Sequence, residues 1–114
     1  MDMQNEKMMQ KILHQIEQGN EGIMILKGIS MEPTLHDGAI LYVKKFSDYN
    51  IGDIIVFSYL NEGYIVHRII DIDRGVILCK GDNAKRVEMI MQRQVIGKVL
   101  HFVDGGVFKN GEVF

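Results

Sequence analysis

One serine stands in a setting that suits nucleophilic chemistry. Ser30 lies two residues after Gly28 and three before Pro33, the only proline of the chain, in the loop sequence GISMEPTLHDG of residues 28–38. A serine nucleophile needs a stiff, sharply turned backbone and nearby N–H groups that can stabilise an oxyanion. Gly28 and Pro33 can supply that backbone. Because G-x-S also occurs in ordinary turns, this spacing alone leaves an inert turn open as the alternative.

Three further blocks follow the serine in order, and the set resembles a known family. They are GDIIVF at 52–57, IVHRII at 65–70 and KGDN at 80–83. With the S-M-x-P-T-L string around Ser30, they resemble the signal peptidase I family and its relatives, the LexA-type self-cleaving repressors. The resemblance runs from about Gly28 to Val99. It implies that Ser30 is the nucleophile and that Met31 and Pro33 shape its loop, and we expect Gly28 and Met31 to belong to the loop that carries the nucleophile and binds the oxyanion.

The same resemblance implies a general base. In bacterial-type members a lysine directly before an arginine takes the proton from the serine, and here that position is His67, followed by Arg68. This is similar to the archaeal and endoplasmic-reticulum type of signal peptidase, in which a histidine replaces the lysine. A neutral imidazole can accept a serine proton near pH 7 without the desolvation that a lysine base requires.

A histidine base needs a third group that fixes its tautomer, and two carboxylates compete for this role. In the histidine-type branch the acid lies six residues beyond the aspartate of the G-D-N string, which leads from Asp82 to Glu88, with Glu in place of Asp. Asp82 is the alternative, although an Asp in this turn can simply bond its own backbone. Lys85 and Arg86, between the two, could draw either carboxylate towards solvent.

Other reactive residues and the overall charge point to no further chemistry. Cys79 lies in the apolar run VILCK, typical of a buried strand, and one cysteine can form neither an internal disulfide nor a zinc site. The remaining histidines, His14, His36 and His101, show no ligand spacing, so we expect no metal and no cofactor. The net charge of −2 offers no broad attraction for nucleic acid, which argues against a nucleic-acid partner.

Two kinds of element must position these residues. Residues 1–20 form a predicted amphipathic helix, because Met8, Met9, Ile12, Leu13 and Ile16 recur at helical spacing. Residues 21–114 form a predicted mainly β domain, a single curved antiparallel sheet of the signal peptidase/LexA-like type. Short β-branched and aromatic runs alternate there with turn residues, which predicts strands within 22–28, 39–46, 52–60, 63–73, 75–83 and 95–103.

The predicted function is peptide hydrolysis by a protein that has no membrane anchor. The longest apolar run, AILYV at 39–43, is far too short to span a bilayer, whereas membrane signal peptidases carry an anchor before the serine block. We also expect no DNA-binding domain of the kind that self-cleaving repressors carry, since these residues leave no room for one. We therefore expect a soluble, cytoplasmic serine endopeptidase whose substrate is a peptide or precursor protein, for example one that loses a leader. The helix 1–20 could also contact a membrane surface peripherally.

Two other classes of function stay open at this point. The first is a catalytically inactive member that binds an extended peptide by strand addition, for which the lack of a convincing acid partner would be the sign. The second is a regulatory domain that docks a partner through the Met-rich helix, because methionine surfaces adapt to varied apolar shapes.

Overall fold

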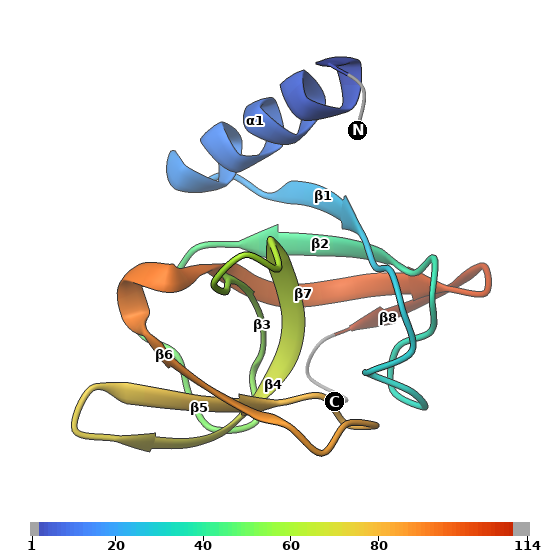
Figure 1. Ribbon diagram of the computed structural model, residues 1–114. Helices are drawn as coiled ribbons and strands as arrows, with labels where there is room; N and C mark the ends of the chain where they lie inside the picture. Colours follow the sequence, from blue (N-terminus) through green and yellow to red (C-terminus); the bar gives the residue numbers. More distant parts are fainter. Residues whose placement is uncertain (1–2, 111–114) are drawn as a thin grey trace.

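A computed structural model describes residues 3–110 of the chain. One helix precedes eight strands that form a single antiparallel sheet, strongly curved and open between its two ends (Figure 1). The strand order is β1-β2-β7-β3-β4-β5-β6, with β8 beside β7. The strands are β1 (Gly22–Ile25), β2 (Ile40–Lys44), β3 (Ile54–Ser58), β4 (Tyr64–Asp73), β5 (Val76–Lys80), β6 (Val87–Met91), β7 (Val95–Asp104) and β8 (Val107–Asn110).

The predicted fold class is confirmed, and two strands were missed. Five of the six predicted strand ranges contain an observed strand, β1 to β5, and the sixth, 95–103, matches β7 except for its last residue. The missed strands are β6, which pairs with β5 and carries Glu88, and β8, which pairs with β7. A short 3-10 helix, η1 (Gln92–Gln94), turns the chain from β6 into β7.

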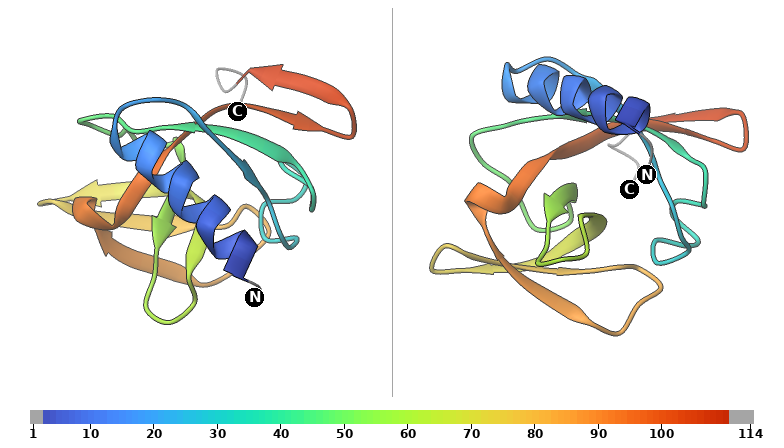
Figure 2. Two further views of the ribbon diagram at one scale, coloured as in Figure 1. Left: turned by 90° about the horizontal axis from the view of Figure 1, so that it is seen from above. Right: turned by 45° about the horizontal axis from the view of Figure 1, so that its top comes forward.

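The helix α1 (Met3–Glu17) packs on the sheet beside β1, on the side opposite the β5–β6 hairpin (Figure 2, right). Ile16 is fully buried there, and Met9 and Ile12 pack against the same cluster, whereas Met8 is 58% exposed and does not belong to the packed face. The helix ends at Glu17, and the φ of +90° at Gly19 turns the chain so that the Asn20 N–H reaches the carbonyl of Gln15. No helix within residues 3–110 is long and apolar enough to cross a membrane.

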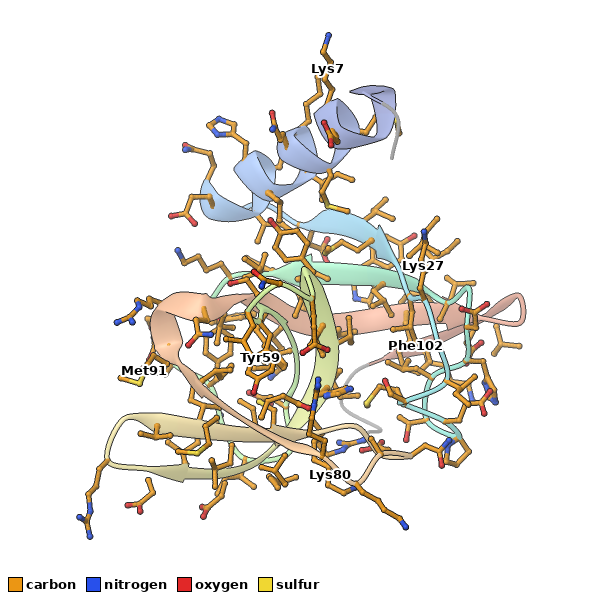
Figure 3. All side chains as sticks on the ribbon, viewed as in Figure 1. Lys7, Lys27, Tyr59, Lys80, Met91 and Phe102 are labelled. Atoms are coloured by element: carbon orange, nitrogen blue, oxygen red, sulfur yellow. The ribbon has the colours of Figure 1, made fainter. Side chains whose placement is uncertain are left out.

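Curvature gives the sheet an interior that is filled by apolar side chains (Figure 3). Strand β3 lies in its middle, and its residues 54–57 are buried on both faces of the strand. Ile54 and Val56 join one cluster with α1, β1 and β2, while Ile55 and Phe57 join a second with β4, β5 and β6. The two clusters hold β4 and β6 at fixed positions around the interior, which is where the candidate site forms.

Candidate active site

Ser30 lies in a closed loop between β1 and β2. The base of the loop is joined by two backbone hydrogen bonds, from the Leu26 N–H to the Ala39 carbonyl (2.9 Å) and from the Gly38 N–H to the Leu26 carbonyl (2.8 Å). Met31, which was predicted to belong to this loop, is fully buried in the core and anchors the loop from within. Ser30 itself stays partly accessible. An anchored loop of this kind fixes where the serine side chain points.

The turn after β5 fastens the same loop from outside. The Asn83 N–H donates to the Ser30 carbonyl at 2.8 Å, and the Asn83 side-chain amide donates to the Ile29 carbonyl at 3.2 Å. Gly81 is buried against this contact: an added Cβ would lie 2.5 Å from the Ser30 carbonyl oxygen and 2.9 Å from Nε2 of His67. Only a glycine permits this close approach, so the GDN string serves here to hold the serine against the histidine.

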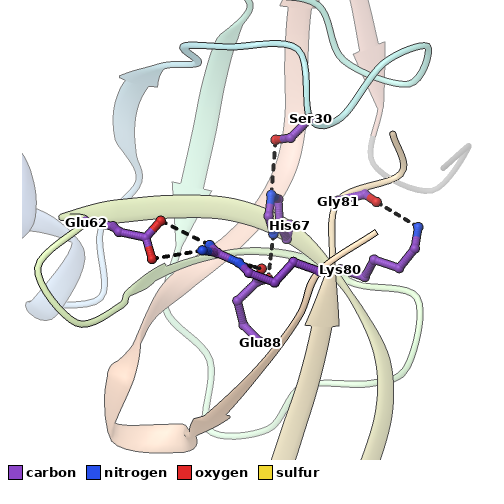
Figure 4. Close-up of polar contacts among 7 residues, drawn as sticks. Ser30, Glu62, His67, Lys80, Gly81 and Glu88 are labelled. Atoms are coloured by element: carbon purple, nitrogen blue, oxygen red, sulfur yellow. Dashed lines mark hydrogen bonds and ion pairs between the residues drawn. The ribbon is translucent and has the colours of Figure 1, made fainter. Parts of the chain in front are cut away.

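Ser30, His67 and Glu88 form a continuous chain of hydrogen bonds (Figure 4). The Nε2 atom of His67 lies 3.0 Å from Oγ of Ser30, and its Nδ1 atom lies 2.6 Å from Oε1 of Glu88. His67 comes from β4 and is 6% exposed; Glu88 comes from the inward face of β6 and is fully buried. Three residues far apart in the sequence thus meet at one point inside the curved sheet.

This order of atoms suits general-base chemistry. An ionised Glu88 can only accept a hydrogen bond, so the proton of a neutral His67 ring belongs on Nδ1. The lone pair of Nε2 then faces the Ser30 hydroxyl and can take its proton. The carboxylate also lies where it can stabilise the imidazolium that would form.

Asp82, the alternative acid, is bound elsewhere. The Arg68 guanidinium grips its carboxylate through two hydrogen bonds, Nε to Oδ1 at 2.9 Å and Nη2 to Oδ2 at 2.8 Å, and the Thr34 hydroxyl donates to it at 2.6 Å. The hydrogen bonds from Arg68 are the main cause that lowers the pKa of Asp82. The structure therefore brings Glu88 and not Asp82 to His67, and Asp82 ties the serine loop to β4.

Two backbone amides of the loop differ in what they can do. The Gly28 N–H donates to Oδ1 of Asp37 at 2.7 Å, so it is already engaged although Gly28 was predicted to help form the oxyanion-binding loop. The N–H of Ser30 donates to no partner within residues 3–110. Gly28 contributes its backbone conformation instead, with a φ of +98° that bends the chain just before the serine.

Arg86 is a member of the site that sequence reasoning placed wrongly. Its Nε donates to Oε2 of Glu88 at 3.0 Å, so it holds the carboxylate in the interior and does not draw it towards solvent. The signal was available in principle: Arg86 and Glu88 are two apart, and alternate residues of a strand share a face. Recognising β6 would have placed Glu88 on its inward face and Arg86, which directly precedes the strand, next to it.

A groove of about 710 Å³ opens next to Ser30 and His67. Most of its lining is apolar, and part of it comes from the segments GIMIL and GDIIVF, from α1 and from β4: Met9, Met24, Ile25, Leu26, Val56 and Val66. Lys27, Glu62 and Arg86 add charge to it. A mainly apolar groove beside the serine suits a peptide substrate with apolar side chains.

The remaining reactive residues lie outside this chain of hydrogen bonds. Cys79 is buried, and its burial raises the pKa of the thiol to about 12, so the thiol is protonated at neutral pH and is a poor nucleophile. His36 pairs with Asp104 at 2.8 Å and His101 with Glu21 at 3.5 Å.

Comparison with known proteins places this geometry in context. A family model described as "Peptidase S24-like" matches residues 3–100. A stretch of 71 residues is 39% identical to a signal peptidase I of Bacillus amyloliquefaciens. That match covers 55% of this chain and 38% of the relative, so the chain spans well under half the length of the curated relative it matches.

Proposed function

This chain belongs to the Peptidase S24-like family, and on that premise we propose that it is a serine peptidase with Ser30 as nucleophile, His67 as general base and Glu88 as the acid that orients it. The observation that carries the proposal is the unbroken chain from Oγ of Ser30 through the His67 ring to the buried Glu88 carboxylate, at 3.0 Å and 2.6 Å. It opens onto an apolar groove and therefore has room for a substrate.

The proposed reaction has two steps. Ser30 Oγ attacks the scissile carbonyl carbon while Nε2 of His67 takes its proton, and the Ser30 N–H stabilises the resulting oxyanion. The C–N bond then breaks, and the imidazolium gives the proton to the leaving amine, which leaves an ester on Ser30. In the second step His67 deprotonates a water that attacks the ester. Collapse returns the proton to Ser30 and releases the carboxylic acid.

The sheet offers two unpaired strand edges for the substrate backbone. In the described part of the chain β1 pairs only with β2, and residues 64–67 of β4 pair only with β3, since pairing with β5 begins at Arg68. Both segments line the groove. An extended peptide can therefore add as a strand, with its side chains in the apolar pockets. Such a segment fits the leader of a peptide or precursor protein better than a folded loop.

Glu88 also bears on the alternative of an inactive peptide-binding domain. The expected sign of an inactive domain was a His67 without an acid partner. In the structure the Glu88 carboxylate lies 2.6 Å from Nδ1 of His67. The geometry thus favours the enzyme.

A peptide-cleavage assay tests this function. We expect the purified protein to cleave internally quenched peptides with small apolar residues at the cut site faster than peptides with bulky charged residues there, because the groove is mainly apolar. Ile25→Asp is expected to raise KM by roughly 10-fold, since it puts a charge where an apolar side chain would bind. The readout is fluorescence, with the cut site identified by mass spectrometry.

Strand β1 supplies a matched control. Ile23 and Ile25 lie on the same outward face and are 51% and 65% exposed, but only Ile25 lines the groove. Ile23→Asp should therefore leave KM unchanged. Equal effects of both substitutions, or a preference for charged residues at the cut site, would place the substrate elsewhere.

A further inference from the structure

A carboxylate fully removed from water needs a partner for each of its oxygens. Glu88 is 0% exposed and lies on the inward face of β6. Its Oε1 atom accepts from His67, and its Oε2 atom accepts from Nε of Arg86 at 3.0 Å. An unpaired buried charge is costly, and the usual result is that the group rotates away or takes up a proton. Within residues 3–110, Arg86 is the only lysine or arginine in contact with this carboxylate.

Arg86 is itself held from two sides. Its two terminal nitrogens donate to the two carboxylate oxygens of Glu62, each at 3.1 Å, and its guanidinium carbon lies 5.3 Å from the centre of the Tyr59 ring. The hydrogen bonds that Arg86 donates to Glu62, and then the one it donates to Glu88, raise the pKa of Arg86, which stays charged at any working pH. Tyr59 and Glu62 belong to the turn between β3 and β4, so Arg86 links this turn to the buried acid. Figure 4 shows Glu62 and Glu88 on either side of this contact.

The other ionisable groups around the His67–Glu88 pair contribute little net charge close to it. The Cys79 thiol of β5 faces Glu88 and is neutral, because its pKa is about 12. Asp82, in the turn after β5, is neutralised by Arg68 of β4. Lys27 lines the groove from the serine loop. Arg86, which also pairs with Glu62, is thus the charged side chain that directly contacts the His67–Glu88 pair.

We propose that Arg86 is a positioning residue: it sets a positive charge against the buried Glu88 carboxylate and aims Oε1 at Nδ1 of His67. Its catalytic consequence rests on the proposed peptidase function. The planar Nε–H of the guanidinium fixes Oε2, which leaves Oε1 pointing at the histidine. The extra methylene of Glu gives the carboxylate more freedom to turn than an Asp would have, and Arg86 removes that freedom.

The test is the pH dependence of an Arg86→Gln variant. Without the cation, protonation of the His67–Glu88 pair becomes easier, so the acid limb of the kcat/KM profile should move to higher pH by about half to one unit. Activity at pH 6 should then fall more than activity at pH 8. Arg86→Lys should recover part of the shift, since it keeps the charge but not the planar fork. Arg74→Gln, at a side chain 93% exposed in the β4–β5 turn, is the matched control and should change nothing.

A second measurement does not depend on catalysis. The NMR titration of the His67 ring, assigned with His67→Gln, should show its midpoint at higher pH in Arg86→Gln than in the wild type. Superimposed titrations, or a loss of activity that is equal at every pH, would overturn the role of Arg86. If the wild type cleaves no peptide but the titration shifts as expected, the proposed function fails while the coupling of Arg86 to the pair stands. If Arg86→Gln fails to fold, the same comparison is made with Arg86→Lys.

Discussion

Replacing Glu88 with Gln is expected to lower kcat/KM by roughly 10³- to 10⁴-fold, as loss of the acid does in serine-protease triads. The amide has the shape of the carboxylate but no charge, so it cannot stabilise the imidazolium that forms when Ser30 attacks. Its NH₂ group, placed 2.6 Å from Nδ1, would also favour the tautomer with the proton on Nε2, where no lone pair faces the serine. Steady-state kinetics on folded protein, verified by circular dichroism, give the result.

Asp82→Asn is the matched control for the acid. It should lower Tm by roughly 5–10 °C, since it weakens a bidentate ion pair, and should leave most of the activity. Because Arg68 lowers the pKa of Asp82, this stabilisation is present above the ordinary Asp pKa of roughly 4 and is lost as the pH falls through the lowered value. The two Tm values should therefore converge in acid. If Asp82→Asn abolished cleavage at unchanged Tm and Glu88→Gln were silent, the two roles would be exchanged.

Gly81→Ala is expected to reduce kcat/KM by roughly 100-fold, through displacement of the reacting groups. The added methyl group would lie 2.5 Å from the Ser30 carbonyl oxygen and 2.9 Å from Nε2 of His67, so the loop, the ring or both must move. Gly81 does not have a positive φ, so the cost comes from contact and not from backbone strain. The change should lengthen the distance from Oγ to Nε2, which a crystal structure of the variant would show.

A second glycine separates this effect from a general loss of stability. Gly75, in the β4–β5 turn, has a φ of +81° and open space around its Cα, so Gly75→Ala should destabilise the fold by about 1 kcal/mol through backbone strain alone. Activity per folded molecule should stay at the wild-type value. Full activity of Gly81→Ala with an unmoved Ser30 would show that the close approach is not needed.

The sequence allowed the curved sheet, the serine loop and, apart from Met8, the packed face of the helix to be predicted, because each has a local pattern. Strand β6 was missed since its pattern is inverted: Val87, Met89 and Met91 are exposed while the charged Glu88 points inward. A strand whose one charged residue faces the core looks like a surface segment until its partner is known. Pairing with β5, which sets Glu88 opposite Cys79, is a long-range fact that no local window contains.

The choice between the two acids could also be made only in three dimensions. Glu88 lies two strands away from His67, with β5 between them, a separation of about 10 Å in a flat sheet. Curvature brings the inward faces of β4 and β6 together, and the longer Glu side chain covers the remaining gap. Asp82 is closer in sequence to His67 but is held by Arg68 and Thr34.

The most direct measurement of the central claim is covalent labelling of Ser30. A fluorophosphonate that carries the best-cleaved peptide should react once per molecule, and peptide mapping by mass spectrometry should find the adduct on Ser30, with activity lost in proportion. Ser30→Ala should remain unlabelled and inactive. An adduct on another residue, or full activity in Ser30→Ala, would contradict the account.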